Sequence, residues 1–256
     1  MINIKGLSKS FESHQVLDSL DLTVATGVTL VVLGRSGCGK SVLLKHIVGL
    51  LRPESGEVFI DGEDIWKLRD SRMDALRMKM GMVFQGGALF DSLTVGENVG
   101  FSYIEHMDYF KLSKKEIENR VTESLEMVGL SGIENEMPSE LSGGMKKRVS
   151  LARAICTKPD IILYDEPTTG VDPITADVIN ELIRGLHDVL KVTSIVVTHD
   201  MRSAYKVADR IAMMYKGKII AEGTPGDIQN TQNPVVYQFI NGLAKGPITD
   251  DINHTV

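Results

Sequence analysis

The chain has little of what secreted or membrane-spanning proteins require. Its 256 residues include only two cysteines, Cys38 and Cys156, too few for a disulfide framework and typical of a reducing compartment. No apolar run reaches the length of about 18 residues that a membrane-spanning helix needs. The first ten residues, MINIKGLSKS, lack the apolar segment of a secretory signal.

Excess positive charge is also missing. The chain has 28 Lys and Arg against 34 Asp and Glu, a net charge of −6 with histidine neutral. Proteins that bind nucleic acid through its phosphates need a basic face, so this balance argues against such a partner. The 43% share of hydrophobic residues is ordinary for a globular chain and excludes a disordered one.

Short apolar runs alternate with amphipathic helical patterns, which predicts an α/β fold with a largely parallel sheet. We expect strands at residues 28–33, 80–84, 160–164 and 193–198, and helices at 40–51 and 174–190. We expect the second helix to have one apolar face, which is formed by Ile174, Val178, Ile179, Leu182, Ile183, Leu186 and Val189. Residues 213–222 predict a hairpin that turns at Lys216-Gly217.

Residues 85–141 interrupt the alternation, because they contain no convincing strand. Ser113 and Glu116 form a capping box, followed by apolar residues at helical spacing: Ile117, Val121, Leu125 and Val128. The simplest interpretation is a helical subdomain at about residues 86–145, inserted into a sheet domain of residues 1–230. In the C-terminal extension, residues 231–256, we expect a short amphipathic helix at 233–244 and a loose tail at 245–256.

One segment matches the glycine-rich phosphate-binding pattern G-x-x-x-x-G-K-[ST] between a predicted strand and a predicted helix. It consists of Gly34, Arg35, Ser36, Gly37, Cys38, Gly39, Lys40 and Ser41. Such a loop turns backbone N–H groups toward phosphate oxygens at a helix N-terminus. Lys40 would reach the β- and γ-phosphates, and the Ser41 hydroxyl would ligate Mg²⁺. The motif therefore predicts nucleotide binding.

Polar side chains follow three other predicted strands: Asp165 and Glu166, His199, and Gln85. If the sheet is parallel, these residues and the glycine-rich loop meet at one edge. Asp165 would hold Mg²⁺, and Glu166 would act as general base on the attacking water. His199 would contact the γ-phosphate and orient the water, while Gln85 would contact Mg²⁺ and water. Taken alone, the acid pair could equally cap a helix, and a histidine at a strand end is more often structural.

A second anion site is predicted at Leu141-Ser142-Gly143-Gly144-Met145, which precedes a helix. Ser142 can cap this helix, and Gly143 and Gly144 leave its first N–H groups open to an anion, although an ordinary capped helix is the alternative. One γ-phosphate needs one cradle from its own chain, so the second cradle is expected to serve another subunit's nucleotide. The basic run at residues 146–148 is interpreted as a solvated helix face rather than a nucleic-acid patch.

With these motifs in this order, the sequence resembles the ATP-binding subunits of ABC transporters over nearly all of residues 1–230. The resemblance identifies residues 34–41 as Walker A, Gln85 as the Q-loop, 141–145 as the signature, 161–166 as Walker B, Asp172 as part of the D-loop and His199 as the switch histidine. It implies a P-loop NTPase (RecA-like) core with an antiparallel β-subdomain and a helical subdomain. It also implies a head-to-tail homodimer that holds ATP and Mg²⁺ between Walker A of one chain and the signature of the other.

Phe11 matches the aromatic residue that stacks on adenine in this family. The chain departs from the family at two positions: Met145 stands where most members have Gln, and Phe11 replaces the commoner Tyr. Neither change removes a phosphate ligand or the base, so ATP hydrolysis is still implied.

Residues 86–95, and residues 233–242 followed by 246–248, resemble the ATPases of MCE-type (Mla-like) systems, which transport phospholipids between bacterial membranes. This resemblance implies two partners, an integral-membrane permease and an MCE-domain lipid-binding protein. It places the chain peripherally on the cytoplasmic face of the inner membrane. Residues 88–90 are expected either to pack in the core or to form an apolar patch for the permease. The tail helix could dock on its own domain or on a neighbour.

Other functions stay open. The chain could serve an ABC importer for a small solute. A non-transport ABC ATPase acting on DNA or ribosomes would show coiled-coil insertions or two nucleotide domains, which this sequence lacks. The signature motif argues against an unrelated phosphoryl-transfer kinase.

Overall fold

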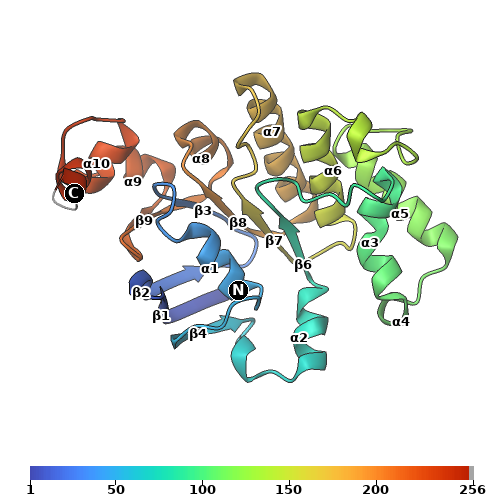
Figure 1. The fold of residues 1–256 in the computed structure, drawn as a ribbon, viewed down its shortest axis with the longest axis horizontal. Coiled ribbons are helices and arrows are strands. Elements are labelled where there is room, and N and C mark those ends of the chain that lie inside the picture. Colours follow the sequence, from blue (N-terminus) through green and yellow to red (C-terminus); the bar gives the residue numbers. More distant parts are fainter. Residues whose placement is uncertain (254–256) are drawn as a thin grey trace. The chain divides into compact units, whose positions relative to one another are not determined.

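The structure, a computed structural model, describes residues 1–253 and divides into two compact units. Unit 1 combines residues 1–66 with the chain from Val197 onward, and unit 2 spans Lys67–Val196. Figure 1 labels most of the helices and strands of the two units. Among the described residues, none of the helices combines the length and the apolar character that crossing a bilayer requires.

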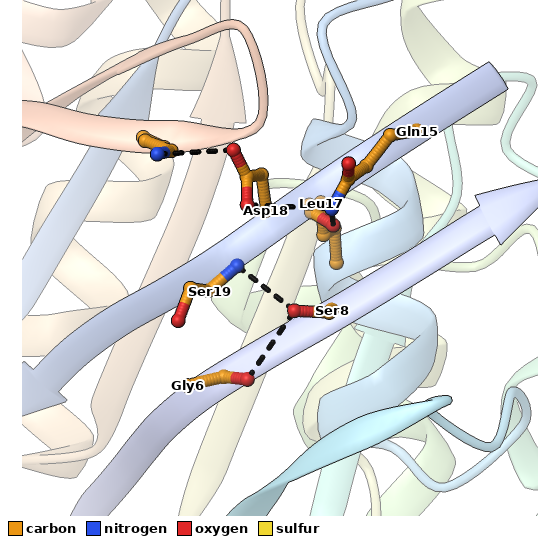
Figure 2. A network of polar contacts seen from close by, with 7 residues as sticks. Gly6, Ser8, Gln15, Leu17, Asp18 and Ser19 are labelled. Carbon is orange, nitrogen blue, oxygen red and sulfur yellow. Dashed lines mark hydrogen bonds and ion pairs between the residues drawn. The ribbon is translucent and has the colours of Figure 1, made fainter.

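Unit 1 contains an antiparallel sheet in the order β2-β1-β4-β5. Its strands are β1 (Ile2–Phe11), β2 (His14–Val24), β4 (Ser55–Ile60) and β5 (Glu63–Asp64). The register of β1 against β2 shifts after Ile4, and Figure 2 shows the contacts at this irregularity. There the Ser8 hydroxyl accepts a hydrogen bond from the Ser19 N–H (2.9 Å) and donates to the Gly6 carbonyl (3.5 Å). The sheet corresponds to the antiparallel β-subdomain that the resemblance implied.

Unit 1 also contains neighbouring strands in the order β10-β9-β3. They are β3 (Thr29–Leu33), β9 (Arg210–Tyr215) and β10 (Lys218–Gly223). β3 is buried along its whole length and runs parallel to β9, as expected for a central strand. β9 and β10 form the predicted hairpin, and both residues of its turn, Lys216 (φ 48°) and Gly217 (φ 75°), adopt the left-handed conformation of a type I′ turn.

Three helices of unit 1 are α1 (Lys40–Ile47), α8 (Met201–Val207) and α9 (Pro225–Gln229). α1 is shorter than the predicted span 40–51. Gly49 adopts a φ of 74°, and the Leu50 N–H returns to the Lys45 carbonyl (2.8 Å), which is a glycine-terminated helix end.

The C-terminal extension has more structure than its sequence predicts. Helix α10 (Pro234–Ile240) matches the expected short helix. The expectation of a loose tail from residue 245 is wrong for α11 (Pro247–Asn253), and residues 254–256 lie outside the described part of the chain. The buried side chain of Gln238 accepts a hydrogen bond from the Ile248 N–H (2.7 Å) and donates to the Thr249 hydroxyl (3.2 Å), so α10 holds α11 in place.

Unit 2 contains β6 (Met80–Val83) next to β7 (Ile161–Asp165), and β7 lies next to β8 (Thr193–Thr198), within which the unit boundary falls. β6 and β7 run parallel in one register, as predicted. Unit 2 also holds α2 (Asp70–Arg77) and α7 (Pro173–Leu190). The predicted apolar face of α7 is partly wrong, because Ile174, Val178 and Val189 are exposed.

Between residues 85 and 141, all of them described, the chain contains helices and no strand, as predicted. These helices are α3 (Val95–Glu105), α4 (Met107–Phe110) and α5 (Lys114–Met127), and α6 (Gly143–Ile155) follows. α3, α5 and α6 pack against one another (Figure 1). The predicted capping box is present, since the Ser113 hydroxyl accepts from the Glu116 N–H (3.3 Å) and the Glu116 carboxylate accepts from the Ser113 N–H (2.8 Å).

Candidate functional site: a nucleotide-binding loop and a second anion cradle

The glycine-rich loop lies between β3 and α1 in unit 1, as predicted. Gly37 (φ 80°) and Gly39 (φ 108°) adopt backbone conformations that favour glycine. A side chain on Gly34 would meet the Met214 carbonyl at 2.7 Å, so β9 fixes the start of the loop. Lys40 is buried, and its ammonium group donates to the carbonyls of Gly34 (2.8 Å) and Arg35 (3.0 Å). This places a cation beside a glycine-rich loop at a helix N-terminus, a geometry suited to phosphate.

A cavity of about 400 Å³ borders this loop. Residues 35–38 of the loop, residues 14–16 of β2, the β9–β10 turn and Ile248 of α11 line it. The C-terminal extension therefore lies beside the glycine-rich loop of its own chain. Phe11, at the end of β1, leaves 45% of its surface exposed, and the Lys9 ammonium lies 5.5 Å from the centre of its ring. An exposed aromatic ring offers a nucleotide base a stacking surface; its adenine-binding role stays a prediction.

In unit 2, two buried acidic residues, Asp165 and Glu166, lie at the carboxyl end of strand β7. Asp165 is 8% exposed and Glu166 is 7% exposed. Glu166 adopts a φ of 48°, a strained conformation for a residue with a side chain, and its carboxylate accepts from the Thr169 hydroxyl (3.2 Å). Because Val83 pairs with Tyr164 in parallel register, Gln85 leaves the sheet at the same edge as the two acids. The structure thus brings these three residues of unit 2 to one edge.

The signature segment begins α6. Ser142 is the N-cap residue, and its hydroxyl accepts from the Met145 N–H (3.3 Å). No side chain would collide with a Cβ at Gly143, whereas a Cβ at Gly144 would meet the Thr175 methyl group at 2.9 Å. The Thr175 side chain is fixed in turn by Asp172, the N-cap of α7, whose carboxylate accepts from the Thr175 hydroxyl (2.5 Å). Hydrogen bonds from Thr175 hold the pKa of Asp172 below its ordinary value.

A cavity of about 570 Å³ lies at this helix start. It is lined by Ser142, Gly143, Gly144, Asp172 and Thr175, together with Arg148 and Gly170. The N-terminus of α6, with two glycines and a capping serine, opens into it. Helix N-termini carry partial positive charge and unpaired N–H groups, so this cavity is chemically suited to an anion. No acidic residue lies in the first turn of α6 to compete for that position.

His199 follows β8 in unit 1 and is exposed, next to Asp200, the N-cap of α8. Its contact with a γ-phosphate stays a prediction. The three residues predicted to bind Mg²⁺ are Ser41, Gln85 and Asp165. Each offers a side-chain oxygen atom, which is the kind of ligand that Mg²⁺ prefers. The described residues contain no cluster of three or more histidine, cysteine, aspartate or glutamate side chains able to hold a metal by themselves.

An apolar groove of about 360 Å³ lies beside the Q-loop. Ala88, Phe90 and Phe101 line it, and the rings of the two phenylalanines lie 4.5 Å apart. Phe90 is 42% exposed, so this cluster is not simply interior packing. A groove of this kind suits an apolar segment of a partner.

The interpretation of residues 146–148 as a solvated face is wrong for Lys147, which is only 8% exposed. Its ammonium group donates to the Gln85 carbonyl. Ser150 and Arg153, on the same helix, also bond the Q-loop backbone, and sequence reasoning missed all three. The only available signal was the i, i+3, i+6 spacing of three polar residues, which a solvated face shows equally.

The chain is similar to known proteins in sequence and in structure. The sequence profile described as "ABC transporter" matches residues 17–169. The intermembrane phospholipid transport system ATP-binding protein MlaF of Haemophilus influenzae is 43% identical, over 97% of this chain and 93% of its own length. The probable ribonucleotide transport ATP-binding protein mkl of Mycobacterium leprae is 40% identical, over 96% of this chain and 70% of its own.

A solved structure is also similar: the ATP-binding cassette MJ0796, described as a dimeric post-hydrolysis state bound to ADP and Pi. It superposes with a TM-score of 0.78 at 34% sequence identity, covering 88% of this chain and 99% of the cassette.

Proposed function

The chain belongs to the ABC transporter family as an ATP-binding and ATP-hydrolysing subunit, and we propose that it energises phospholipid transport between bacterial membranes. The observation that carries the ATP-dependent part of this proposal is the pair of phosphate-suited cradles in one chain, the loop at residues 34–41 and the N-terminus of α6, and the relative named MlaF carries the choice of phospholipid. Two copies arranged head to tail would place the α6 N-terminus of each copy against the nucleotide held by the other copy's loop. We also propose residues 1–230 as the ATPase domain, residues 86–145 as its helical subdomain and residues 231–256 as an extension.

In this mechanism, ATP binding joins two copies of the chain. Lys40 and the N–H groups of its loop hold the phosphates from one side, and Ser142, Gly143 and Gly144 of the partner copy hold the γ-phosphate from the other. Glu166 accepts a proton from the attacking water, and His199 orients that water. Cleavage removes the group that bridges the two copies, so they separate.

Mg²⁺, bound by Ser41, Gln85 and Asp165, would supply charge compensation for the phosphate oxygens. Phe11 would stack on adenine, and Asp172 would stabilise the start of α7 beside the shared site. The groove beside Gln85 would receive an apolar segment of an integral-membrane permease, which transmits closure of the dimer. We place the chain peripherally on the cytoplasmic face of the inner membrane, in a complex that includes an MCE-domain lipid-binding protein and no nucleic acid.

The relative named MlaF supports phospholipid as the cargo, whereas the relative named mkl favours a second candidate, transport of a small solute such as a ribonucleotide. Purification of the intact membrane complex through a tag on this chain separates the two. We expect a permease, an MCE-domain protein and bound phospholipid in the complex, and ATP-dependent transfer of labelled phospholipid after reconstitution into vesicles. A small-solute-binding protein in the complex, with ribonucleotide uptake and no lipid transfer, would refute the lipid assignment.

A further inference from the structure

The start of α6 packs against the start of α7 at one residue, Thr175. Gly144, the second residue of α6, has a helical backbone, so its own conformation does not call for glycine. A Cβ built on Gly144 would meet the Thr175 methyl group at 2.9 Å, closer than real Cβ atoms come to a neighbour. Thr175 therefore fills the space that a side chain at position 144 would need, and the first turn of α6 lies directly on α7.

The methyl group of Thr175 is held in one direction by the hydroxyl group on the same carbon atom. This hydroxyl donates to the Asp172 carboxylate (2.5 Å), which also accepts from the backbone N–H groups of Ile174 and Thr175 (3.0 Å each). Because threonine is branched at Cβ, a bond that fixes its hydroxyl also fixes its methyl group. Asp172 thus sets, through Thr175, where the first turn of α6 lies.

This contact lies inside the second anion cradle. Gly144, Asp172 and Thr175 line the same cavity as the capping residue Ser142. The Ser142 hydroxyl accepts from the Met145 N–H, a bond within α6 that does not tie the helix start to another element. The N–H groups offered to an anion belong to this first turn, so a shift of the turn displaces the donors. A misplacement of about 1 Å in such a site can slow an enzyme by about 100-fold.

We propose that Thr175 is a positioning residue for ATP hydrolysis, whose methyl group sets the place of the α6 N-terminus against the nucleotide of the other copy. This rests on the proposed function, in which the α6 N-terminus of one copy meets the γ-phosphate held by the loop of the other. Thr175 acts through Gly144, and its hydroxyl acts through its methyl group. The consequence is an effect on the rate of cleavage rather than on ATP binding by a single copy, since residues 34–41 bind that nucleotide.

The test is steady-state ATP hydrolysis by the purified chain, with ATP binding measured separately at micromolar protein. Thr175→Ser removes the methyl group alone and is expected to lower kcat about threefold to thirtyfold, with ATP binding within about twofold of wild type. Thr175→Ala should lose no more than Thr175→Ser, whereas Thr175→Val keeps a methyl group toward Gly144 and should recover most of the loss. Thr122→Ser is the matched control and should behave as wild type, because the Thr122 hydroxyl also donates to a carboxylate, that of Glu134 (3.1 Å), but outside the cavity.

The decisive readout is Thr175→Ser in a Gly144→Ala background, followed by thermal melts and phosphate release. Thr175→Ser removes the atom that the new Cβ would meet, so the double variant should be more stable than Gly144→Ala and at least about threefold faster. If Gly144→Ala does not fold, the double variant should fold. Losses that add in the double variant, its failure to fold, a wild-type kcat for Thr175→Ser, or an equal loss of ATP binding would overturn the positioning role and leave the proposed function intact. Wild-type turnover by Ser142→Arg would instead refute the site shared between copies.

Discussion

Replacing Gly143 with alanine is expected to make the folded chain slightly more stable and nearly inactive. Gly143 is the first residue of α6, and beyond its own helix backbone and chain neighbours a Cβ built on it would meet no atom within 4 Å. Alanine favours a helix over glycine by about 1 kcal/mol in a helix interior, and we expect about half of that at the first position. For a chain of this size, the melting temperature should rise by about 1–2 °C.

The loss of activity follows from the partner's nucleotide. In the proposed dimer, the open space at Gly143 is where the γ-phosphate of the other copy approaches the N–H groups of α6. A methyl group there keeps the phosphate from its donors. Loss of one well-placed donor to a reacting oxyanion typically slows an enzyme by about 100-fold or more, and we expect at least that effect.

Gly144→Ala is the matched control for stability. Its Cβ would meet the Thr175 methyl group at 2.9 Å, and Thr175 is held by Asp172, so this variant should lose about 1–3 kcal/mol. The assay combines thermal melts, ATP binding at micromolar protein and phosphate release at high protein concentration. Gly143→Ala should bind ATP within about twofold of wild type. Normal turnover by a stable Gly143→Ala protein would refute the claim that this cradle contacts a nucleotide.

Three further outcomes are expected. Glu166→Gln should bind ATP, accumulate as dimers in size-exclusion chromatography and release phosphate at least about 100-fold more slowly; monomers in the presence of ATP would contradict this. His46 is buried, and burial holds its pKa below the ordinary 6.5. The unfolded chain therefore binds this proton more readily, so stability should fall as the pH drops below 6.5, by at most about 1.4 kcal/mol per pH unit from this group. As the pH is lowered over this range, the urea midpoint of His46→Leu should fall less steeply than that of the wild type. Equal slopes for the two proteins would contradict the assignment. Tyr103→Phe removes buried bonds to the Cys156 carbonyl (2.5 Å) and from Arg120 (2.8 Å), so it should cost about 1–3 kcal/mol in chemical unfolding; an unchanged midpoint would contradict this.

Features that depend on neighbouring residues in the chain were predictable from sequence. The glycine-rich loop, the Ser113–Glu116 capping box and the Lys216-Gly217 turn each depend on local backbone chemistry, and all three occur where expected. The strands at 161–165 and 193–198 were predictable because buried strands are apolar on both faces.

Features that depend on distant segments were not predictable. Lys147 is buried because the Q-loop, some sixty residues earlier in the chain, packs on α6. Helix α11 forms because Gln238 of another helix bonds its first turn. On α7, Ile174 and Val178 are apolar but exposed, next to the second anion cradle, where they line its cavity. Helical periodicity in the sequence identifies the apolar residues of a helix. It does not show which of those residues are buried by other segments of the same chain.

Mixing two inactive variants tests most directly whether ATP is shared between copies. Lys40→Ala damages the glycine-rich loop, and Ser142→Arg blocks the second cradle, so neither variant alone should hydrolyse ATP. A mixed dimer has one intact composite site, built from the loop of the Ser142→Arg chain and the signature of the Lys40→Ala chain. An equimolar mixture should therefore regain about a quarter of the wild-type rate, since half of the dimers are mixed and each has one of two sites. A mixture as inactive as its parents, in protein that is shown to exchange subunits, would contradict the head-to-tail site.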